Sequence, residues 1–348
     1  MPILIPIVSS RKIESNETDI SWLHLSSSDT IQEILNCPTL IARSAEFYKN
    51  SQFRANEADR VFFVQEGEII SGISEYDFDV IGTDDATTCH MLLMRTISDD
   101  FHSSWMVCHI DSEDRCESLN SYMTDLVQQS RDIKCNHIEV YVCGGLECDS
   151  TSDNISLSLF CALARTDIDC RIHLWSTSRL NTSWVIQDSQ KLAFPRALGM
   201  AYVSSLEQVV PAIFPLHVRG PCPDIRSAIG FVNSFSEENH TQFRSIFLPS
   251  GGLCVLDISP LLDIPLEIVR IAYSLLGIKD DNEVLMLTST SPHCEPDHFV
   301  AVRRAVSTLV VNIRTNPSVL NDIGYDGSNS VITFEYKTDS TSWVIQGK

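Results

Sequence analysis

The chain carries the sequence IGTDDATTCHMLLMR at residues 81–95. An acidic turn that contains Gly82 leads through small hydroxylic residues to the thiol of Cys89, and an apolar run typical of a strand follows. A turn at the entrance of a strand leaves backbone N–H groups unpaired, while the strand holds the thiol in one direction. Cys89 is therefore a candidate nucleophile, although most free cysteines are buried and serve as small apolar residues.

A second strand is predicted downstream, at residues 105–110, and would return beside the first as the other arm of a hairpin. Alternation along this strand places His109 on the same face as Trp105. If Cys89 shares that face near the same end of the hairpin, the two residues form a Cys-His dyad. His90 must then point to the opposite side. The alternative interpretation of His109 is a core histidine with both nitrogens satisfied.

Such a dyad can hydrolyse a carboxamide. The thiolate of Cys89 would attack the amide carbon, backbone amides of the Thr87-Thr88-Cys89 turn would stabilise the oxyanion, and His109 would protonate the departing ammonia. Water would then hydrolyse the thioester. The overall reaction converts a carboxamide into a carboxylate.

Two other chemistries fit this part of the sequence less well. Zinc-ligating side chains are dense here, at Cys89, His90, Cys108, His109 and Cys116. Alternation, however, splits adjacent residues across the sheet, so that few of them could converge on one ion. A Ser-His-Asp hydrolase would need a GxSxG elbow, which the sequence lacks. We therefore expect no metal ion and no other cofactor.

Composition indicates a globular, acidic protein. Of the 348 residues 43% are hydrophobic, and the formal net charge of −21 argues against nucleic acid or anionic membranes as partners. No apolar run reaches the roughly 18 residues of a membrane span, and residues 1–8 lack the features of a signal peptide. Twelve cysteines are scattered without a CxxC pair. We expect a monomer in the cytoplasm, or also in the nucleus, with reduced cysteines.

Strand-like runs dominate the chain and are interrupted by single helices. We predict strands at residues 60–65, 68–73, 89–95, 105–110, 137–143, 171–176, 208–214, 252–256 and 331–336, and helices at 118–132, 154–165, 223–235 and 298–314. Without regular βαβ alternation, this order predicts an α/β (α+β) fold with a mixed, largely antiparallel, β-sandwich-like core flanked by helices. We expect one domain over residues 1–348, with a flexible insertion at 13–29 and a second poorly ordered stretch at 178–191.

Three blocks of the sequence resemble the animal protein N-terminal asparagine amidohydrolases. Residues 82–90, GTDDATTCH, are similar to the LGSDDATTCH block of that family. The segment from Ser289 to Pro292, with Glu295-Pro296 and the HFV of residues 298–300, is similar to its STSP…EPPHFV block. Residues 138–145 resemble a weaker third block, and the Met1-Pro2 start is shared. The blocks occur in matching order over most of the chain.

The resemblance implies an enzyme that hydrolyses the side-chain carboxamide of an N-terminal Asn in proteins or peptides, giving N-terminal Asp and ammonia. That product would be arginylated and degraded through the ubiquitin branch of the N-degron pathway. The family nucleophile corresponds to Cys89. A looser similarity to bacterial chemotaxis-receptor deamidases, which would be distant relatives in fold, makes His109 the base and Thr83 the residue that orients it.

An enzyme for N-terminal Asn must hold a free α-ammonium group, and a partly shielded carboxylate is suited to that role. Asp84, Asp85 and Glu295 are the candidates, although adjacent turn aspartates usually cap the turn through their own side chains. We expect Thr88, beside the nucleophile, to contact the substrate as well. His298 either lines the same pocket or faces solvent.

A second class of function remains open. The same fold could serve as a binding module that recognises N-terminal residues without turning them over. The presence of Cys89 in a complete turn favours the enzyme, because a binding module has no need of a thiolate.

Overall fold

The computed structural model describes residues 3–8, 20–25, 31–97, 103–131, 137–147, 149–166, 169–187, 189–236, 241–247, 253–337 and 342–346. Its largest sheet has eight strands. In spatial order they are β15 (Arg244–Ser245), β5 (Glu68–Ser74), β8 (Ser103–Ile110), β7 (His90–Ile97), β9 (Ile138–Gly144), β10 (Cys170–Thr177), β1 (Ile3–Val8) and β2 (Ile20–Leu25). The neighbours from β5 to β9 pair antiparallel, and β9, β10 and β1 pair parallel.

A five-stranded sheet packs against one face of the large sheet. Its strands, in order, are β3 (Phe53–Arg54), β14 (Gln208–Ile213), β13 (Met200–Val203), β6 (Val80–Thr83) and β4 (Val61–Phe63). Met91 and Val107 of the large sheet are fully buried against Ile81 and Met200 of the smaller one. Each such apolar side chain contributes roughly 1.5–3 kcal/mol when it leaves water. The two sheets therefore form a sandwich.

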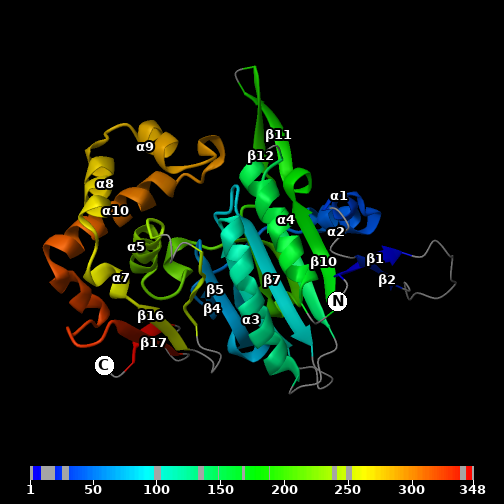
Figure 1. Cartoon of the computed structure of the whole chain (residues 1–348), viewed down its shortest axis with the longest axis horizontal. Coiled ribbons are helices and arrows are strands. Elements are labelled where there is room, and N and C mark those ends of the chain that lie inside the picture. The colour runs from blue at the N-terminus through cyan, green and yellow to red at the C-terminus, as the bar shows by residue number, and fades with distance from the viewer. Residues whose placement is uncertain are drawn as a thin grey trace.

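Helices cover the opposite face of the large sheet (Figure 1). They are α3 (Glu113–Arg131) and α4 (Ser150–Ala164), whereas α1 (Ile31–Asn36) and α2 (Pro38–Lys49) lie at the end of the sheet near β10, where α2 also contacts β14 of the smaller sheet. Leu92 and Cys108 point to this side and pack with Leu119 of α3 and Leu159 of α4. Successive residues of β7 and β8 thus enter two different cores, which is the alternation predicted for the hairpin.

The C-terminal part of the chain forms a third group of elements, on the left in Figure 1. Its helices are α5 (Pro223–Asn233), α7 (Ser259–Leu262), α8 (Leu266–Gly277), α9 (Asp281–Thr288) and α10 (Phe299–Thr315), and its sheet has β16 (Leu253–Asp257), β17 (Val331–Lys337) and β18 (Ser342–Ile345). Short 3-10 helices are η1 (Glu75–Asp77), η2 (Ser178–Leu180), η3 (Ser204–Leu206), η4 (Leu216–Val218), η5 (Pro292–Cys294) and η6 (Pro317–Ile323). Among the described helices, none combines the length and apolar character that crossing a membrane requires.

The predicted mixed sandwich with flanking helices is confirmed, and the prediction of a poorly ordered stretch at 178–191 is wrong. Residues 178–191 contain η2 and β11 (Thr182–Gln187), and the second strand of that hairpin, β12 (Gln190–Pro195), begins at their end. Of the predicted flexible insertion at 13–29, residues 20–25 form β2, which pairs with β1. The rest of that insertion lies outside the described residues, and both its flexibility and the single-domain assignment stay predictions.

Candidate active site

The hairpin of β7 and β8 determines where Cys89 and His109 lie. His90 pairs with Ile110 and Met91 with His109, so His109 faces the same side as Met91 and, two residues earlier, Cys89. Cys89 is partly exposed, and only 3% of the His109 surface is exposed. His90 points the other way, where its Nε2 lies 2.7 Å from the Ser156 hydroxyl of α4. The predicted sides of all three residues are confirmed.

Thr83 reaches His109 from the other sheet. It is the last residue of β6, and its hydroxyl shares a hydrogen bond of 2.9 Å with Nδ1 of His109. This contact restrains the rotation of the ring and leaves Nε2 as the nitrogen for other partners. Thr83 and His109, named together by the resemblance, are thus in direct contact across the sandwich.

The turn before Cys89 is held by backbone contacts on both sides. The N–H of Ala86 donates to the carbonyl of Leu198, and the N–H of Gly145 donates to the carbonyl of Cys89, each at 2.9 Å. A Cβ on Gly144 would lie 2.3 Å from the Cys89 carbonyl oxygen, so only glycine allows this approach. Within the described part of the chain, the N–H groups of residues 87–89 donate no hydrogen bond. They remain available to an oxyanion.

The loop between α9 and α10 contacts the turn that precedes Cys89. The hydroxyl of Thr88 shares a 3.0 Å hydrogen bond with that of Thr290, and the hydroxyl of Thr87 lies 3.5 Å from Glu295 Oε1. Ser289 also donates to Glu295. Two of the sequence blocks, about 200 residues apart, are therefore joined around the candidate nucleophile.

Asp84 and Asp85 share an arginine that the sequence did not single out. Arg219, which is 7% exposed, lies 2.9 Å from Asp84 Oδ1 and donates to Asp85 Oδ2 at 2.6 Å. Asp84 also accepts the Phe214 N–H, and Asp85 lies 3.0 Å from Nε2 of His298. Both carboxylates are therefore engaged within the protein. The role of either in binding substrate stays a prediction.

Replacement of Arg219 by Met should lower the free energy of unfolding by about 3–5 kcal/mol, because the buried Asp84 would lose its counter-charge. Urea denaturation measures this loss. The matched control is Arg54→Met, at an exposed arginine of β3. If both variants changed the free energy of unfolding by less than about 1 kcal/mol, the ion pairs of Arg219 would not stabilise the turn.

The contact between His298 and Asp85 should make stability depend on pH. The hydrogen bond to Asp85 raises the pKa of His298 above its usual value. A histidine with a raised pKa stabilises the fold below its ordinary pKa of about 6.5, and this contribution is lost as the pH rises through the raised value. We expect His298→Gln to lower the melting temperature more near pH 5.5 than near pH 9. An equal decrease at both pH values would contradict this.

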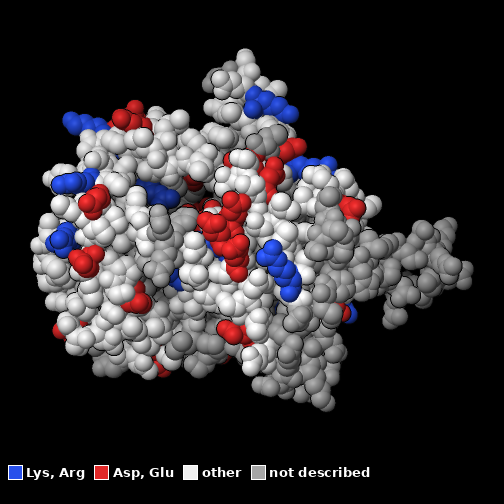
Figure 2. All heavy atoms as spheres, viewed as in Figure 1, with Lys and Arg blue, Asp and Glu red and all other residues white. Residues whose placement is uncertain are grey.

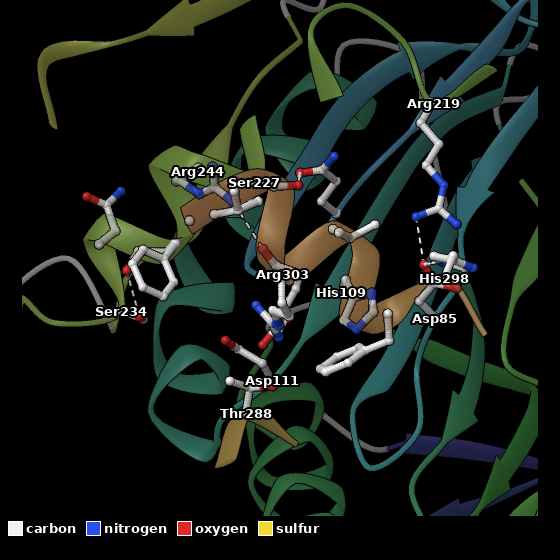
Figure 3. A pocket seen from close by; sticks show the side chains of 18 of the residues that line it. Asp85, His109, Asp111, Arg219, Ser227, Ser234, Arg244, Thr288, His298 and Arg303 are labelled. Carbon is white, nitrogen blue, oxygen red and sulfur yellow. Dashed lines mark hydrogen bonds and ion pairs between the residues drawn. The ribbon is translucent and has the colours of Figure 1, made fainter. Parts of the chain in front are cut away.

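A cavity of about 510 Å³ adjoins the dyad. Asp85 and His298 lie at one end, His109 and Asp111 line the middle, and Ser234 lies at the far end (Figure 3). Figure 2, which has the same view as Figure 1, shows acidic side chains gathered beside a hollow in the middle of the molecular surface. Sequence reasoning missed Asp111, although its position two residues after His109, directly beyond an alternating strand, was a usable signal.

The protonation states of the dyad follow from burial and from nearby charge. Burial raises the pKa of the Cys89 thiol well above its usual range, and three carboxylates raise it further. In order of effect they belong to Glu66, Asp111 and Glu295. Burial lowers the pKa of His109, against the charges of Glu66 and Asp111. Near neutral pH the pair is therefore a thiol beside a neutral imidazole, which can accept the thiol proton.

No group of three or more His, Cys, Asp or Glu side chains is placed to hold a metal ion in the ranges that the structure describes. The soft ligands noted in the sequence are divided by the sheet. Cys108 and Cys116 lie in the core on the helical side, whereas Cys89 packs against the core between the sheets.

Comparison with known proteins identifies the same family that the three sequence blocks resemble. The family model described as "Protein N-terminal asparagine amidohydrolase" matches residues 51–331. Proteins of that name are 24% identical to the chain in Mus musculus, over 69% of this chain and 71% of the relative, and in Homo sapiens, over 78% and 80%. The protein of that name in Sus scrofa is also 24% identical, again over 78% and 80%. The chain belongs to the protein N-terminal asparagine amidohydrolase family, a family of hydrolases that act on amides.

Proposed function

We propose that the protein hydrolyses the side-chain carboxamide of an N-terminal Asn in proteins or peptides, with Cys89 as the nucleophile. The observation that carries this proposal is the strand register, which places Cys89 and His109 on one face near the same end of the hairpin. The bond from Thr83 to His109 supports an oriented base.

The reaction has two stages. His109 Nε2 takes the proton from the Cys89 thiol as the sulfur attacks the side-chain carbonyl carbon. The tetrahedral intermediate then collapses, its C–N bond breaks, and His109 returns the proton to the nitrogen, which leaves as ammonia. In the second stage His109 deprotonates water, which attacks the thioester carbon. The C–S bond breaks, His109 returns the proton to the sulfur, the Cys89 thiol is regenerated, and the Asp side-chain acid leaves and ionises to its carboxylate.

Backbone amides stabilise the oxyanion in this mechanism. The N–H groups of residues 87–89 have no acceptor among the described residues. Thr88 is proposed to position substrate through its hydroxyl, which shares a hydrogen bond with Thr290. Removal of one such donor in other enzymes costs on the order of 10²–10³ in turnover.

The product also suggests a cellular role. An N-terminal Asp would be a substrate for arginylation and then for ubiquitin-dependent degradation, as the family resemblance implies. We propose that the partners are proteins or peptides that begin with Asn, and that the enzyme acts as a monomer in the cytoplasm or nucleus.

Ammonia release tests this proposal. The purified protein is incubated with a peptide that begins with Asn, with the same peptide acetylated at its N-terminus, and with one that begins with Gln. We expect ammonia and N-terminal Asp from the first peptide, and far less ammonia from the acetylated one. Binding of the Asn peptide without ammonia release would indicate a binding module instead.

A further inference from the structure

The position of the α-ammonium group follows from the chemistry of attack. In Asn the α-nitrogen is three bonds from the side-chain carbonyl carbon, so the two atoms are at most about 4 Å apart. When Cys89 attacks that carbon, the ammonium must lie within a few ångströms of the sulfur. A carboxylate that recognises it must therefore lie close to Cys89 and open onto the substrate cavity.

The carboxylates selected from the sequence meet this requirement poorly. Asp84 and Asp85 are engaged by Arg219, and their charges are not among those that act most strongly on Cys89. Glu295 contacts the turn before Cys89, but its carboxylate already accepts the hydroxyls of Ser289 and Thr87. In the absence of substrate each of these three carboxylates already has two partners.

Glu66 and Asp111 lie on the wall of the cavity beside the dyad. Asp111 follows β8 two residues after His109, and Glu66 belongs to the turn between β4 and β5. Two hydrogen bonds join these segments: the Gly67 N–H donates to the His109 carbonyl at 3.1 Å, and Arg115 donates to the Gly67 carbonyl at 3.3 Å. These hydrogen bonds therefore fix the backbone positions of Glu66 and Asp111 relative to His109.

Each carboxylate has one arginine partner. Asp111, with 14% of its side chain exposed, forms an ion pair with Arg115 through Oδ1. Glu66, with 52% exposed, is 3.7 Å from Arg303 of α10, a long contact that is weak in water. The His109 ring, almost completely buried, lines the same cavity, and its Nε2 has no hydrogen-bond partner within the described ranges. The cavity therefore presents an unpartnered nitrogen next to two carboxylates.

We propose that Asp111 and Glu66 together hold the α-ammonium group of the substrate and so restrict the reaction to a free N-terminal residue. This inference rests on the proposed function. The ammonium lies between the two carboxylates, in place of the long contact between Glu66 and Arg303. Charge-assisted hydrogen bonds from the ammonium then fix the side-chain amide over Cys89.

Substrate binding in this position also affects the nucleophile. Glu66 and Asp111 are the two strongest charges opposing ionisation of Cys89. A bound ammonium neutralises them, so the thiol loses its proton more readily when substrate is present. A peptide without a free amine gains neither the ionic contact nor this effect.

The test compares two peptides that differ only in the amine. One begins with Asn, and the other begins with the succinamoyl group, which is Asn without its α-amino group. We expect Glu66→Gln and Asp111→Asn each to lower kcat/KM for the Asn peptide by about 10- to 100-fold. For the succinamoyl peptide kcat/KM should not fall, because no ammonium is present to lose its partner and the thiol ionises more readily without the carboxylate.

Two further variants serve as controls. Glu113→Gln removes an exposed carboxylate from the first turn of α3, outside the cavity, and should leave both peptides unaffected. Glu295→Gln should affect both peptides equally, because that carboxylate supports the turn at Thr87. Asp111→Asn also loses the ion pair with Arg115, so its melting temperature is measured; Glu66→Gln tests the proposal if Asp111→Asn does not fold.

Equal losses for both peptides in Glu66→Gln would overturn the proposal, as would an effect on the Asn peptide alone in Glu295→Gln. Alkylation of Cys89 by iodoacetamide gives a second readout, and near pH 7 we expect Glu66→Gln to react faster than the native protein. An unchanged rate would also count against the proposal. The proposed function fails separately, if Cys89→Ala still releases ammonia.

Discussion

Cys89→Ala should release ammonia from an Asn-initiated peptide at least about 10⁴-fold more slowly than the native protein, because no other group can form the thioester. Binding of the peptide should persist, since the cavity and its carboxylates are intact. The fold should also persist, because Cys89 is partly exposed and loses only one sulfur atom. Ammonia release and peptide binding are measured on the same preparation.

Cys161→Ala is the matched control for this variant. Cys161 is a partly exposed free cysteine on α4, on the other side of the large sheet from Cys89. Its replacement should leave turnover unchanged. If Cys89→Ala kept ammonia release while remaining folded, Cys89 would not be the nucleophile.

His109→Ala should reduce kcat by about 10²–10⁴-fold with a smaller change in KM, because the variant loses its general base and acid. The pH profile should change as well. Without a base, turnover depends on spontaneous ionisation of a thiol whose pKa is raised by burial, so the remaining activity should increase toward alkaline pH. In the native protein the neutral imidazole accepts the proton at lower pH.

The exposed His217 provides the control for this second variant, since His217→Ala removes an imidazole far from the dyad on the chain and outside the cavity. Kinetics across pH and a thermal melt are compared for both variants. A His109→Ala protein that lost stability but kept the native kcat and pH profile would show that the histidine is structural.

The hairpin was predictable because its signal is local. Alternation along residues 105–110 determines the face of His109, and the antiparallel return of the strand brings that face to Cys89. The contact of Thr83 with His109 joins two different sheets, and only the looser similarity to chemotaxis-receptor deamidases pointed to it. No periodicity in the sequence relates one sheet to the other.

Arg219 could not be selected from the sequence because its partners are distant along the chain. It is separated by 134 residues from Asp85, and a single arginine among 25 basic residues carries no pattern. Glu66 likewise lies in a turn that is positioned by pairing of β5 with β8. The hydrogen bond from the Gly67 N–H to the His109 carbonyl forms only in that pairing. Asp84 and Asp85 were selected from the sequence without knowledge of Arg219, which forms ion pairs with both carboxylates.

Secondary structure was missed where apolar residues did not mark a single face. The helix α8 exposes Leu266, Ile271 and Tyr273 as well as burying Ile268, so its apolar residues extend well beyond the face that it buries. In β11 three consecutive apolar residues, Trp184 to Ile186, are exposed, which hides the alternation of a strand. Pattern reading depends on a buried face, and these elements have an incomplete one.

The thioester on Cys89 is the central claim, and rapid-quench mass spectrometry tests it most directly. Native protein is mixed with an excess of an Asn-initiated peptide, stopped in acid within the first turnover and digested. We expect the peptide, less one ammonia, attached to the fragment that contains Cys89, together with an equal amount of free ammonia. Attachment to a different residue, or full turnover with no adduct at any time and undiminished activity in Cys89→Ala, would contradict the account.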